Sequence, residues 1–389
     1  MSWNKYMVEE RLIPIINGLA IVMIIVSLYM DSKLVLFLAI FSLAVCIGNH
    51  FYLKQVGDLL FVENLAEKKR FFINEKGNWV ITFRNEGFPI LKGEIKVYFD
   101  HFVAPEGDHI ESTLSVYQIT VPLSIYTKQT KQFKLSFSAK MRGIAKIRKL
   151  EIHIPSLLGF GETILESKYF LNQQAIVYPE RIPVKGLKDY LSNLQGTNVV
   201  PYSVYKDPLG PVGTREYVPT DSFNHIHWKA SAKHQSLQTK IYEAISERGW
   251  TIAINVSDGH SITGNLERLL SCITEFAYFA LEQKIPYSVC INVRTAGNTP
   301  FLFLSKGEGK EHLQKVLETL ASISTQNSSL PYDHMLSFIN NHLGEQPFFL
   351  HAGIRTDATK RLLFNMTKKG TRLFELVLEK ETGVLTGLK

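Results

Sequence analysis

Cysteine is scarce in this sequence, and the familiar catalytic motifs are missing. Its 389 residues include only Cys46, Cys272 and Cys290, which are widely spaced and lie in apolar surroundings. Without a CxxC pair or an even-numbered set, neither a disulfide framework nor a zinc site is predicted, and a reducing compartment fits best. The sequence also lacks a glycine-rich phosphate loop, a GxSxG elbow and the HExxH spacing, so these common signatures of enzymes are excluded.

A strong excess of charge of one sign is absent too. The chain has 43 Lys and Arg residues against 36 Asp and Glu residues, which gives a net charge of +7. There is no basic stripe with interleaved aromatic residues, so no nucleic-acid partner is expected. In a protein with a membrane segment, this mild basic bias fits attraction to anionic lipid.

Long apolar runs do occur, and they lie at the N-terminus. One run covers residues 13–30 and the next covers residues 34–53. Each approaches the length of about 20 residues that crosses a bilayer core of about 30 Å. Only Asp31, Ser32 and Lys33 separate them. The pattern predicts a two-helix transmembrane hairpin over residues 1–54 that contacts lipid through residues 13–53. A signal peptide is disfavoured, because no small-residue cleavage site follows the first run.

Positive charge predicts how the hairpin is oriented. Lys5 and Arg11 precede it and Lys54 follows it, whereas the turn carries only Lys33. Positively charged flanks stay in the cytoplasm. We therefore expect a multi-pass protein of the plasma membrane whose C-terminal domains are cytoplasmic.

Short alternating segments follow from residue 58 to residue 183. Apolar and polar residues alternate with period two in 77–87, 93–100, 114–123, 131–140 and 147–154, with turn signals between them. This spacing predicts an antiparallel β-sandwich of immunoglobulin-like type. Its histidines show no spacing typical of metal ligands, so it is interpreted as a spacer or interaction module.

The C-terminal part, residues 249–389, alternates strands and helices. Residues 249–259 form a continuous apolar run typical of a central parallel strand, and residues 264–284 have a helical apolar face. A doubly wound α/β sheet is predicted, in which ligands bind at the carboxyl ends of the strands. Residues 256–264 occupy that place after the first strand. The signature and linker segment, residues 184–248, lies before this domain.

Polar residues are densest in this segment, in the stretch REYVPTDSFNHIHWKASAK (215–233). Asp221 is predicted to cap a helix on which His227, Ser231 and His234 would share a face while His225 points elsewhere. A catalytic interpretation lacks a convergent third group. An interdomain latch accounts for more of the residues, because Arg215 can pair with Glu216 or Asp221 while Tyr217 and Trp228 pack. Docking of a partner through the exposed basic edge is the other interpretation.

The same stretch resembles the signature of a domain-of-unknown-function family, number fifty-eight. The matching positions are Arg215, Glu216, Tyr217, Pro219, Asp221, Ile226, His227, Trp228, Lys229, Ala230 and Ala232, and Thr220 stands where the family usually has Gly. Residues 141–162 and 175–180 also resemble family segments, so the likeness covers nearly the whole chain. The family consists of bacterial membrane proteins often encoded beside MoxR-type AAA+ ATPases.

This resemblance implies a von Willebrand A-like fold for the C-terminal half. Such domains often carry an Asp-x-Ser-x-Ser metal site after the first strand, where this chain has Asn255, Val256, Ser257, Asp258 and Gly259. A carboxylate and a hydroxyl of that motif are therefore missing, which weakens any Mg²⁺ site. The remaining candidate ligands are Ser257 and Asp258.

Together these features favour a membrane-tethered, non-enzymatic scaffold or adaptor. Its von Willebrand A-like domain would bind a cytoplasmic partner in assembling an envelope complex, and the resemblance implies a MoxR-type AAA+ ATPase as that partner. The alternative is a metal-dependent hydrolase with a degenerate site near Ser257 and Asp258.

Overall fold

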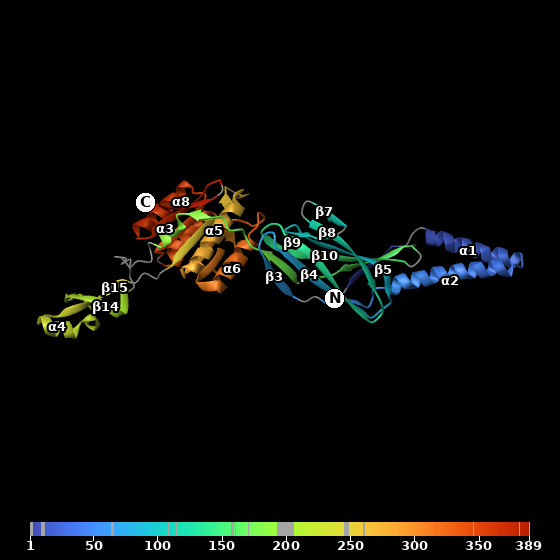
Figure 1. Cartoon of the computed structure of the whole chain (residues 1–389), viewed down its shortest axis with the longest axis horizontal. Coiled ribbons are helices and arrows are strands. Elements are labelled where there is room, and N and C mark those ends of the chain that lie inside the picture. Colours follow the sequence, from blue (N-terminus) through green and yellow to red (C-terminus); the bar gives the residue numbers. More distant parts are fainter. Residues whose placement is uncertain are drawn as a thin grey trace. The chain divides into compact units, whose positions relative to one another are not determined.

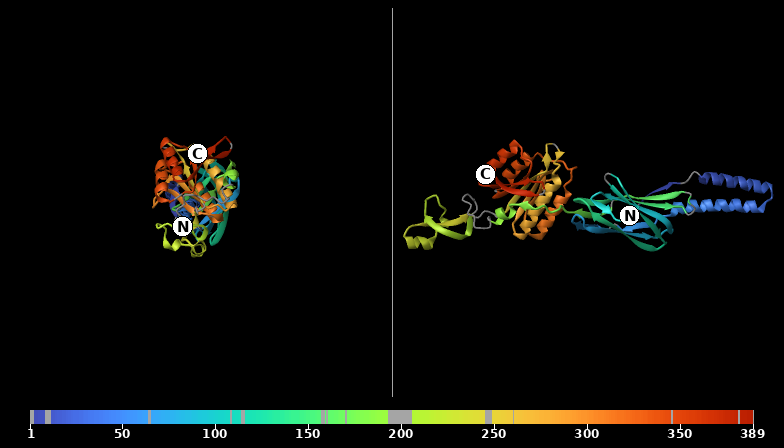
Figure 2. Two further views of the ribbon diagram at one scale, coloured as in Figure 1. Left: turned by 90° about the vertical axis from the view of Figure 1, so that its left-hand side faces the viewer. Right: turned by 45° about the horizontal axis from the view of Figure 1, so that its top comes forward.

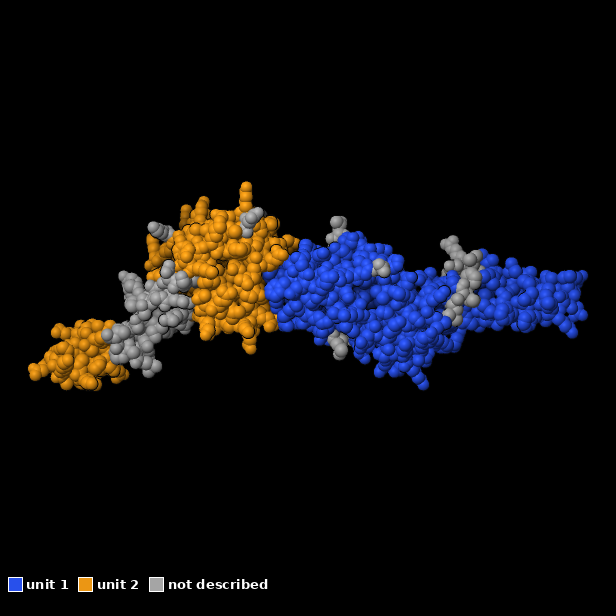
Figure 3. All heavy atoms as spheres, viewed as in Figure 1, with its two compact units in different colours: residues 1–179 blue, residues 180–389 orange. Residues whose placement is uncertain are grey.

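The structure, a computed structural model, describes residues 3–388 except 9–11, 64–65, 108, 114–115, 157–158, 160, 170, 193–205, 245–248, 260, 345 and 381. It is a mixed α/β protein made mostly of β-sheet. The chain divides into two compact units, Met1–Pro179 and Glu180–Lys389 (Figure 3). The predicted boundary at residue 183 lies close to this division.

Two apolar helices stand near the N-terminus. Helix α1 (Leu12–Tyr29) and helix α2 (Lys33–Gln55) lie side by side in both orientations of the molecule (Figures 1 and 2). Among the described residues, α2 is the one helix long and apolar enough to cross a membrane, while α1 counts as a shorter apolar helix. The structure therefore has one candidate membrane span near the N-terminus.

The residues before the helices form a strand that the sequence did not indicate. Strand β1 (Trp3–Val8) pairs antiparallel with β11 (Glu162–Ser167) at the edge of a large sheet. The Trp3 indole N–H donates to the carbonyl of Leu60, and the Lys5 ammonium pairs with Asp58 at 2.7 Å. Both ends of the helical pair are thus tied to one β-domain.

That β-domain consists of two sheets, which are antiparallel except for the parallel pair of β3 and β12. The larger has the order β1-β11-β10-β5-β8-β7, with β12 and β3 attached through β10, and the smaller has the order β2-β4-β9-β6. Each predicted alternating segment contains a strand, which confirms the period-two pattern, although residues 114–115 lie outside the described residues. Their bounds are β2 (Leu60–Glu63), β3 (Glu67–Phe71), β4 (Lys76–Asn85), β5 (Ile90–Asp100), β6 (Val103–Pro105), β7 (Ile110–Ser112), β8 (Val116–Ile125), β9 (Gln129–Ala139), β10 (Gly143–Pro155) and β12 (Gln173–Val177).

One hydrophobic core joins the two sheets. Trp79 from the smaller sheet packs on Phe99 from the larger one, with the two rings 5.3 Å apart, and Phe137 packs on the other side chain of this pair, Trp79. The last turn of α2 enters the same core, where Leu53 is fully buried. Apolar side chains alternate inward along each strand, so the polar positions of β5 and β10 face outward.

The second unit is built on a seven-stranded sheet with the order β13-β23-β22-β21-β16-β19-β20. Strand β16 (Trp250–Asn255) is buried on both faces between β19 (Tyr287–Arg294) and β21 (Phe348–Gly353), to which it is parallel. This confirms a central parallel strand. The remaining elements are β13 (Val184–Lys185), α3 (Leu187–Ser192), α5 (Leu266–Glu282), β20 (Phe301–Gly307), α6 (Gly309–Ser322), α7 (Tyr332–His342), α8 (Asp357–Lys368), β22 (Arg372–Leu378) and β23 (Gly383–Leu388).

Two details of this unit differ from the sequence prediction. It is mixed rather than fully parallel, because β20 and β23 pair antiparallel with β19 and β22. The side chains of β20 and β23 are only partly buried, so these strands carry a weaker pattern than the buried central run. In addition, the sequence predicts Asp357 as the N-cap of a helix over residues 357–370, whereas Asp357 is the first residue of α8. The cap is Thr356, which exchanges hydrogen bonds with Thr359 in a capping box.

Candidate functional site

The carboxyl ends of β16 and β21 meet where the order of the sheet reverses, which is the usual ligand crevice of an α/β fold. Asn255 ends β16, and Gly353 ends β21 beside it. Gly353 has a φ of +116°, and a Cβ there would collide with the Asn255 carbonyl oxygen. Only glycine suits this close approach.

A network of amides fills the crevice. The Asn292 side-chain amide donates to Asn255 Oδ1 at 2.8 Å and to Ser257 Oγ at 3.0 Å, while its oxygen accepts from the Val256 N–H. Asn255 Oδ1 also accepts from the Ser257 hydroxyl, and its amide donates to the carbonyl of Ile354. The oxygens that could have faced a ligand therefore already accept hydrogen bonds.

These oxygens do not fit a Mg²⁺ ion. The ion prefers anionic ligands in octahedral array, whereas Asn255, Ser257 and Asn292 are neutral and bonded to one another. Asp258 lies in the short hairpin of β17 (Ser257–Asp258) and β18 (Ser261–Ile262), where its side chain is exposed. Among the described residues, no group of three or more His, Cys, Asp or Glu side chains is placed to hold a metal.

A buried histidine lies beneath the network. His351 is fully buried on β21, and its Nε2 donates to the carbonyl of Gly353 at 3.0 Å. Its Nδ1 lies 2.7 Å from the Tyr332 hydroxyl, so this nitrogen accepts. Burial lowers the pKa of His351 to about 4, because it penalises the charged form. The residue supports the sheet as a neutral group.

The signature stretch forms a small module of its own. Strand β14 (Lys206–Glu216) pairs antiparallel with β15 (Gln238–Ala244) (Figure 1). A 3₁₀ turn, η1 (Phe223–His225), and helix α4 (Trp228–His234) connect the two strands in the sequence. The predicted segment, residues 184–248, also contains residues 193–205 and 245–248, which are outside the described residues.

Asp221 organises this module, although it does not cap a helix as predicted. Its carboxylate pairs with Arg215 at 2.5 Å and accepts from the Val218 N–H and the Thr239 hydroxyl. The Arg215 pair, followed by the Val218 and Thr239 bonds, lowers the pKa of Asp221 to about 2. The pairing predicted between Arg215 and Asp221 is therefore present, and it ties β14 to β15.

The histidines and the serine of this module do not assemble a catalytic pair. His227 precedes α4 and caps it, since its Nδ1 accepts from the Ala230 N–H at 3.1 Å. Ser231 donates to the main-chain carbonyl of His227 and accepts from the Gln238 N–H, so its hydroxyl is engaged. The sequence suggested a shared helical face, but His227 lies outside the helix.

The aromatic residues of the module are exposed rather than packed. The exposed fraction is 66% for Phe223 and 61% for Trp228, and their rings lie 6.0 Å apart. Ile226 is buried instead and forms a β-bridge with Thr239. The other predicted signature residues, Glu216, Tyr217, Pro219 and Lys229, lie at the exposed or half-exposed surface of the module.

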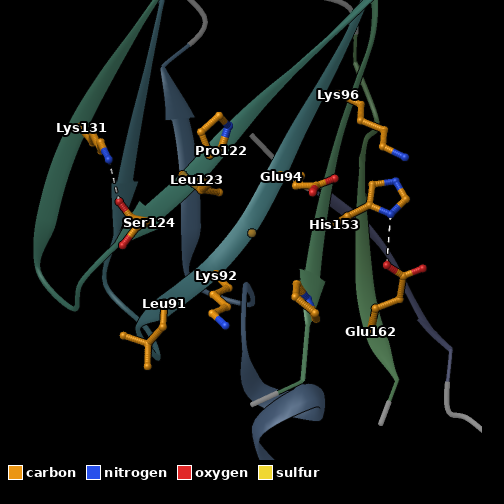
Figure 4. A pocket seen from close by; sticks show the side chains of 12 residues that line it. Leu91, Lys92, Glu94, Lys96, Pro122, Leu123, Ser124, Lys131, His153 and Glu162 are labelled. Carbon is orange, nitrogen blue, oxygen red and sulfur yellow. Dashed lines mark hydrogen bonds and ion pairs between the residues drawn. The ribbon is translucent and has the colours of Figure 1, made fainter. Parts of the chain in front are cut away.

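A pocket on the outer face of the sandwich was not predicted. It has a volume of about 750 Å³ and lies over β5, β8 and β10 (Figure 4). Its charged lining consists of Lys92, Glu94, Lys96, Lys131, His153 and Glu162. The period-two spacing of Lys92, Glu94 and Lys96 was the feature of the sequence that could have indicated this pocket, because it places all three side chains on one face of a strand.

His153 bridges two carboxylates beside this pocket. Its Nδ1 lies 3.2 Å from Glu162, and its Nε2 lies 3.6 Å from Glu151. Burial acts to raise the pKa of Glu151, but bonds from Lys149 and Tyr98 outweigh it and lower that pKa. The sequence suggested only scattered histidines in the sandwich, whereas this one has defined acidic neighbours.

Comparison with known proteins gives no family. No protein-family model and no curated protein matches the chain. Among solved structures it is similar to a sporulation control protein from Bacillus subtilis, at 14% identity and a TM-score of 0.18 over 35% of this chain and 56% of that one. A cohesin from Archaeoglobus fulgidus matches at 6% identity and a TM-score of 0.21, over 35% of this chain and 99% of the cohesin. A membrane-anchored protein from Corynebacterium diphtheriae matches at 13% identity and a TM-score of 0.20, over 32% of this chain and 35% of that one.

These scores are too low to establish a shared fold. The chain also spans little more than half of the sporulation protein, at 56% of its length.

Proposed function

We propose that the protein is a membrane-tethered, non-enzymatic scaffold that binds a cytoplasmic partner through its signature module and a von Willebrand A-like domain. The observation that carries this proposal is the exposed pair of Phe223 and Trp228. Aromatic side chains beside a positive charge such as Lys229 are typical of protein-binding hot spots. The saturated amide network at the crevice favours binding over catalysis, because it presents no activated nucleophile or base.

The anchor in this proposal is a hairpin that crosses the membrane twice. Strand β1 precedes α1 and β2 follows α2, and both belong to the same immunoglobulin-like sandwich. A chain that crossed once would separate these strands by the bilayer. At 18 and 23 residues, the helices reach about 27 and 35 Å, which suits a bilayer core of about 30 Å.

Reporter fusions test the anchor. A reporter that is active only beyond the plasma membrane should be active when inserted at the 31–33 turn and inactive when fused at Lys389, as the positive flanks of the hairpin require. Activity at Lys389 would overturn the cytoplasmic placement. Inactivity at both sites would contradict the double crossing.

The proposed partner is a MoxR-type AAA+ ATPase, and this choice rests on the resemblance of the signature stretch. Binding of the purified ATPase to the full-length chain should be measured with and without ATP. Trp228→Ala should weaken binding by about thirtyfold or more, as expected for a hot-spot aromatic residue. Tyr169→Ala is the matched control, since Tyr169 is a comparably exposed aromatic residue outside the proposed binding domains.

Two outcomes would contradict this function. Absence of ATPase binding in both nucleotide states would remove the partner. If Trp228→Ala lowered the melting temperature and left binding unchanged, the signature module would be an interdomain latch instead. The docking interpretation requires the reverse result, with unchanged melting and weakened binding.

A further inference from the structure

The sandwich pocket lies at the end of its domain where the hairpin enters. On one side, the Phe88 ring packs on Phe51 of α2 at 5.8 Å, and the Tyr52 hydroxyl donates to the carbonyl of Pro89. The chain then continues directly into Leu91 and Lys92, which line the pocket. This wall of the pocket therefore starts at the end of α2.

The opposite wall begins at the hairpin as well. Glu162 lines the pocket and is paired across the sheet with Val8, the last residue of β1 before the helices. The neighbouring Thr163 donates to the carbonyl of Leu53 in α2. If the helices cross a bilayer, as in the proposed function on which this inference rests, the pocket faces the lipid headgroups.

Apolar side chains at this end of the domain suit an interfacial position. Leu59, Phe88, Leu91 and Tyr126 have exposed fractions between 39% and 59%. Phe88 and Tyr126 are neighbours, because the Asn85 side chain donates to the main-chain carbonyls of both. Aromatic and apolar residues gather at the interface between membrane and water.

The charges of the pocket alternate along β5. Lys92, Glu94 and Lys96 point outward on one face of the strand while Gly93 and Ile95 are buried, and Figure 4 shows Glu94 on the strand between the two lysines. Positions two apart on a strand are separated by about 6.7 Å. Neither Lys92 nor Lys96 forms an ion pair with another residue that the structure describes, so both ammonium groups are available to a ligand.

The acidic groups are not equivalent. Glu162 is engaged by His153, whereas Glu94 lies next to His153 across the sheet and has no bond or ion pair within the described part of the chain. Lys131 lies on the far side of the pocket and donates to the carbonyl of Ser124 at 3.0 Å. The free groups are thus two ammonium ions and one carboxylate, in the order plus, minus, plus.

We propose that this pocket binds the phosphoethanolamine headgroup of a membrane phospholipid. Lys92 or Lys96 pairs with the phosphate, and the Glu94 carboxylate accepts hydrogen bonds from the primary ammonium group. Leu91, Pro122 and Pro155 contact the apolar carbons of the headgroup and glycerol. The pocket volume of about 750 Å³ falls in the usual range for small ligands, about 300 to 1,000 Å³.

The pattern of charge selects among common headgroups. A purely anionic headgroup would place its phosphate near Glu94 without offering that carboxylate a cation. A choline headgroup carries the cation but has no N–H to donate. An ethanolamine headgroup satisfies both signs with charge-assisted hydrogen bonds.

The test measures binding of short-chain phospholipids to the full-length protein in detergent, by calorimetric titration. The ethanolamine lipid should bind about tenfold more tightly than the matched choline lipid, which corresponds to one charge-assisted hydrogen bond. It should also bind more tightly than the glycerol lipid. Because these comparisons use the unaltered protein, they do not depend on any variant folding.

Substitutions assign the preference to the pocket. Glu94→Gln should remove the discrimination between ethanolamine and choline lipids, and Lys92→Gln combined with Lys96→Gln should weaken binding of both by about tenfold or more. Lys134→Gln, an exposed lysine on β9 outside the pocket, is the control and should change neither affinity. Melting curves establish that each variant is folded.

Three results would overturn the proposal. They are equal affinity for all three lipids, tighter binding of the anionic glycerol lipid, and free phosphoethanolamine binding as tightly as the lipid. The last result would identify a soluble ligand with the same chemistry. Since the titration needs no bilayer and no ATPase, its failure is distinguishable from failure of the anchor or of the partner.

Discussion

The crevice of the α/β unit and the pocket of the sandwich contain polar side chains in opposite states. In the crevice, Asn255, Ser257 and Asn292 are neutral and hydrogen-bonded to one another. In the pocket, Lys92 and Lys96 are charged and unpaired within the described residues. At a place that usually binds ligands the amides are already hydrogen-bonded to one another, while the face of a supposed spacer domain presents unpaired charges. Hydrogen-bond saturation, more than fold class, decides where a ligand can bind.

The largest expected effect comes from opening the closed network. Asn292→Ala would leave the Val256 N–H and the Leu330 carbonyl without these partners, and would remove one of the hydrogen bonds that Asn255 Oδ1 and Ser257 Oγ each make. Because each unsatisfied buried polar group costs about 1 to 3 kcal/mol, we expect a loss of about 4 kcal/mol in the free energy of unfolding. Denaturant unfolding of the full chain, followed by hydrogen exchange in β16, measures it.

Asn298→Ala is the control for that change, because Asn298 is exposed in the loop between β19 and β20. If both variants unfolded alike, the crevice network would contribute little to stability. The contrast between the hydrogen-bonded crevice and the unpaired charges of the pocket would then be wrong for the crevice.

The second effect concerns the neutral histidine beneath the crevice. His351 has a folded-state pKa of about 4, below its ordinary value of 6.5. The unfolded state therefore binds more protons between these values, and the stability present above pH 6.5 is lost as pH falls toward 4. The loss should reach about 3 kcal/mol. Unfolding free energies at pH 7 and pH 4.5, for the wild type and His351→Gln, measure it.

The groups facing His351 are the Tyr332 hydroxyl and the nearby Arg355, whose charge also lowers the pKa of the histidine. The difference between wild type and variant isolates the contribution of His351 from that of His312, whose pKa is also lowered by burial. An identical pH dependence in both proteins would show that His351 is not protonated on unfolding in this range.

The smallest effect is local to the signature module. Asp221→Asn removes the charge of a half-buried carboxylate, so hydrogen exchange should accelerate severalfold at Val218, whose N–H it binds, and in the neighbouring β14–β15 pair. Exchange in β16 should be unchanged. Asp258→Asn, at an exposed carboxylate of the α/β unit, is the matched control. Acceleration by both variants would show that surface charge in general, and not this pair, holds the module.

Sequence patterns anticipated the elements whose side chains repeat regularly. The alternating segments of the sandwich, the continuous apolar run of β16 and the amphipathic face of α5 each follow from where apolar residues fall. Strand β1 was missed because it is separated by more than 150 residues from its partner β11, as the register of Trp3 with Ser167 shows. No local pattern reports such a pairing.

The candidate sites were harder to anticipate, because they depend on contacts between distant residues. The resemblance drew attention to Ser257 and Asp258, but the hydrogen-bonding centre of the crevice is Asn292, on another strand. Likewise, Asp221 looked like a helix cap because of its local sequence. Its partners Arg215 and Thr239 lie on two strands that only the fold brings together.

The position of β1 has a consequence for how the protein is made. This strand leaves the ribosome before the helices do, whereas β11, the strand it pairs with, ends at Ser167. At about 5 to 20 residues per second, the first strand waits on the order of ten seconds for its partner. Helices α1 and α2 are synthesised within that interval, so in the proposed membrane anchor their entry into a bilayer would come before the sheet can close. A substitution or deletion in β1 would therefore disturb the last step of sandwich assembly, although β1 is translated well before β11.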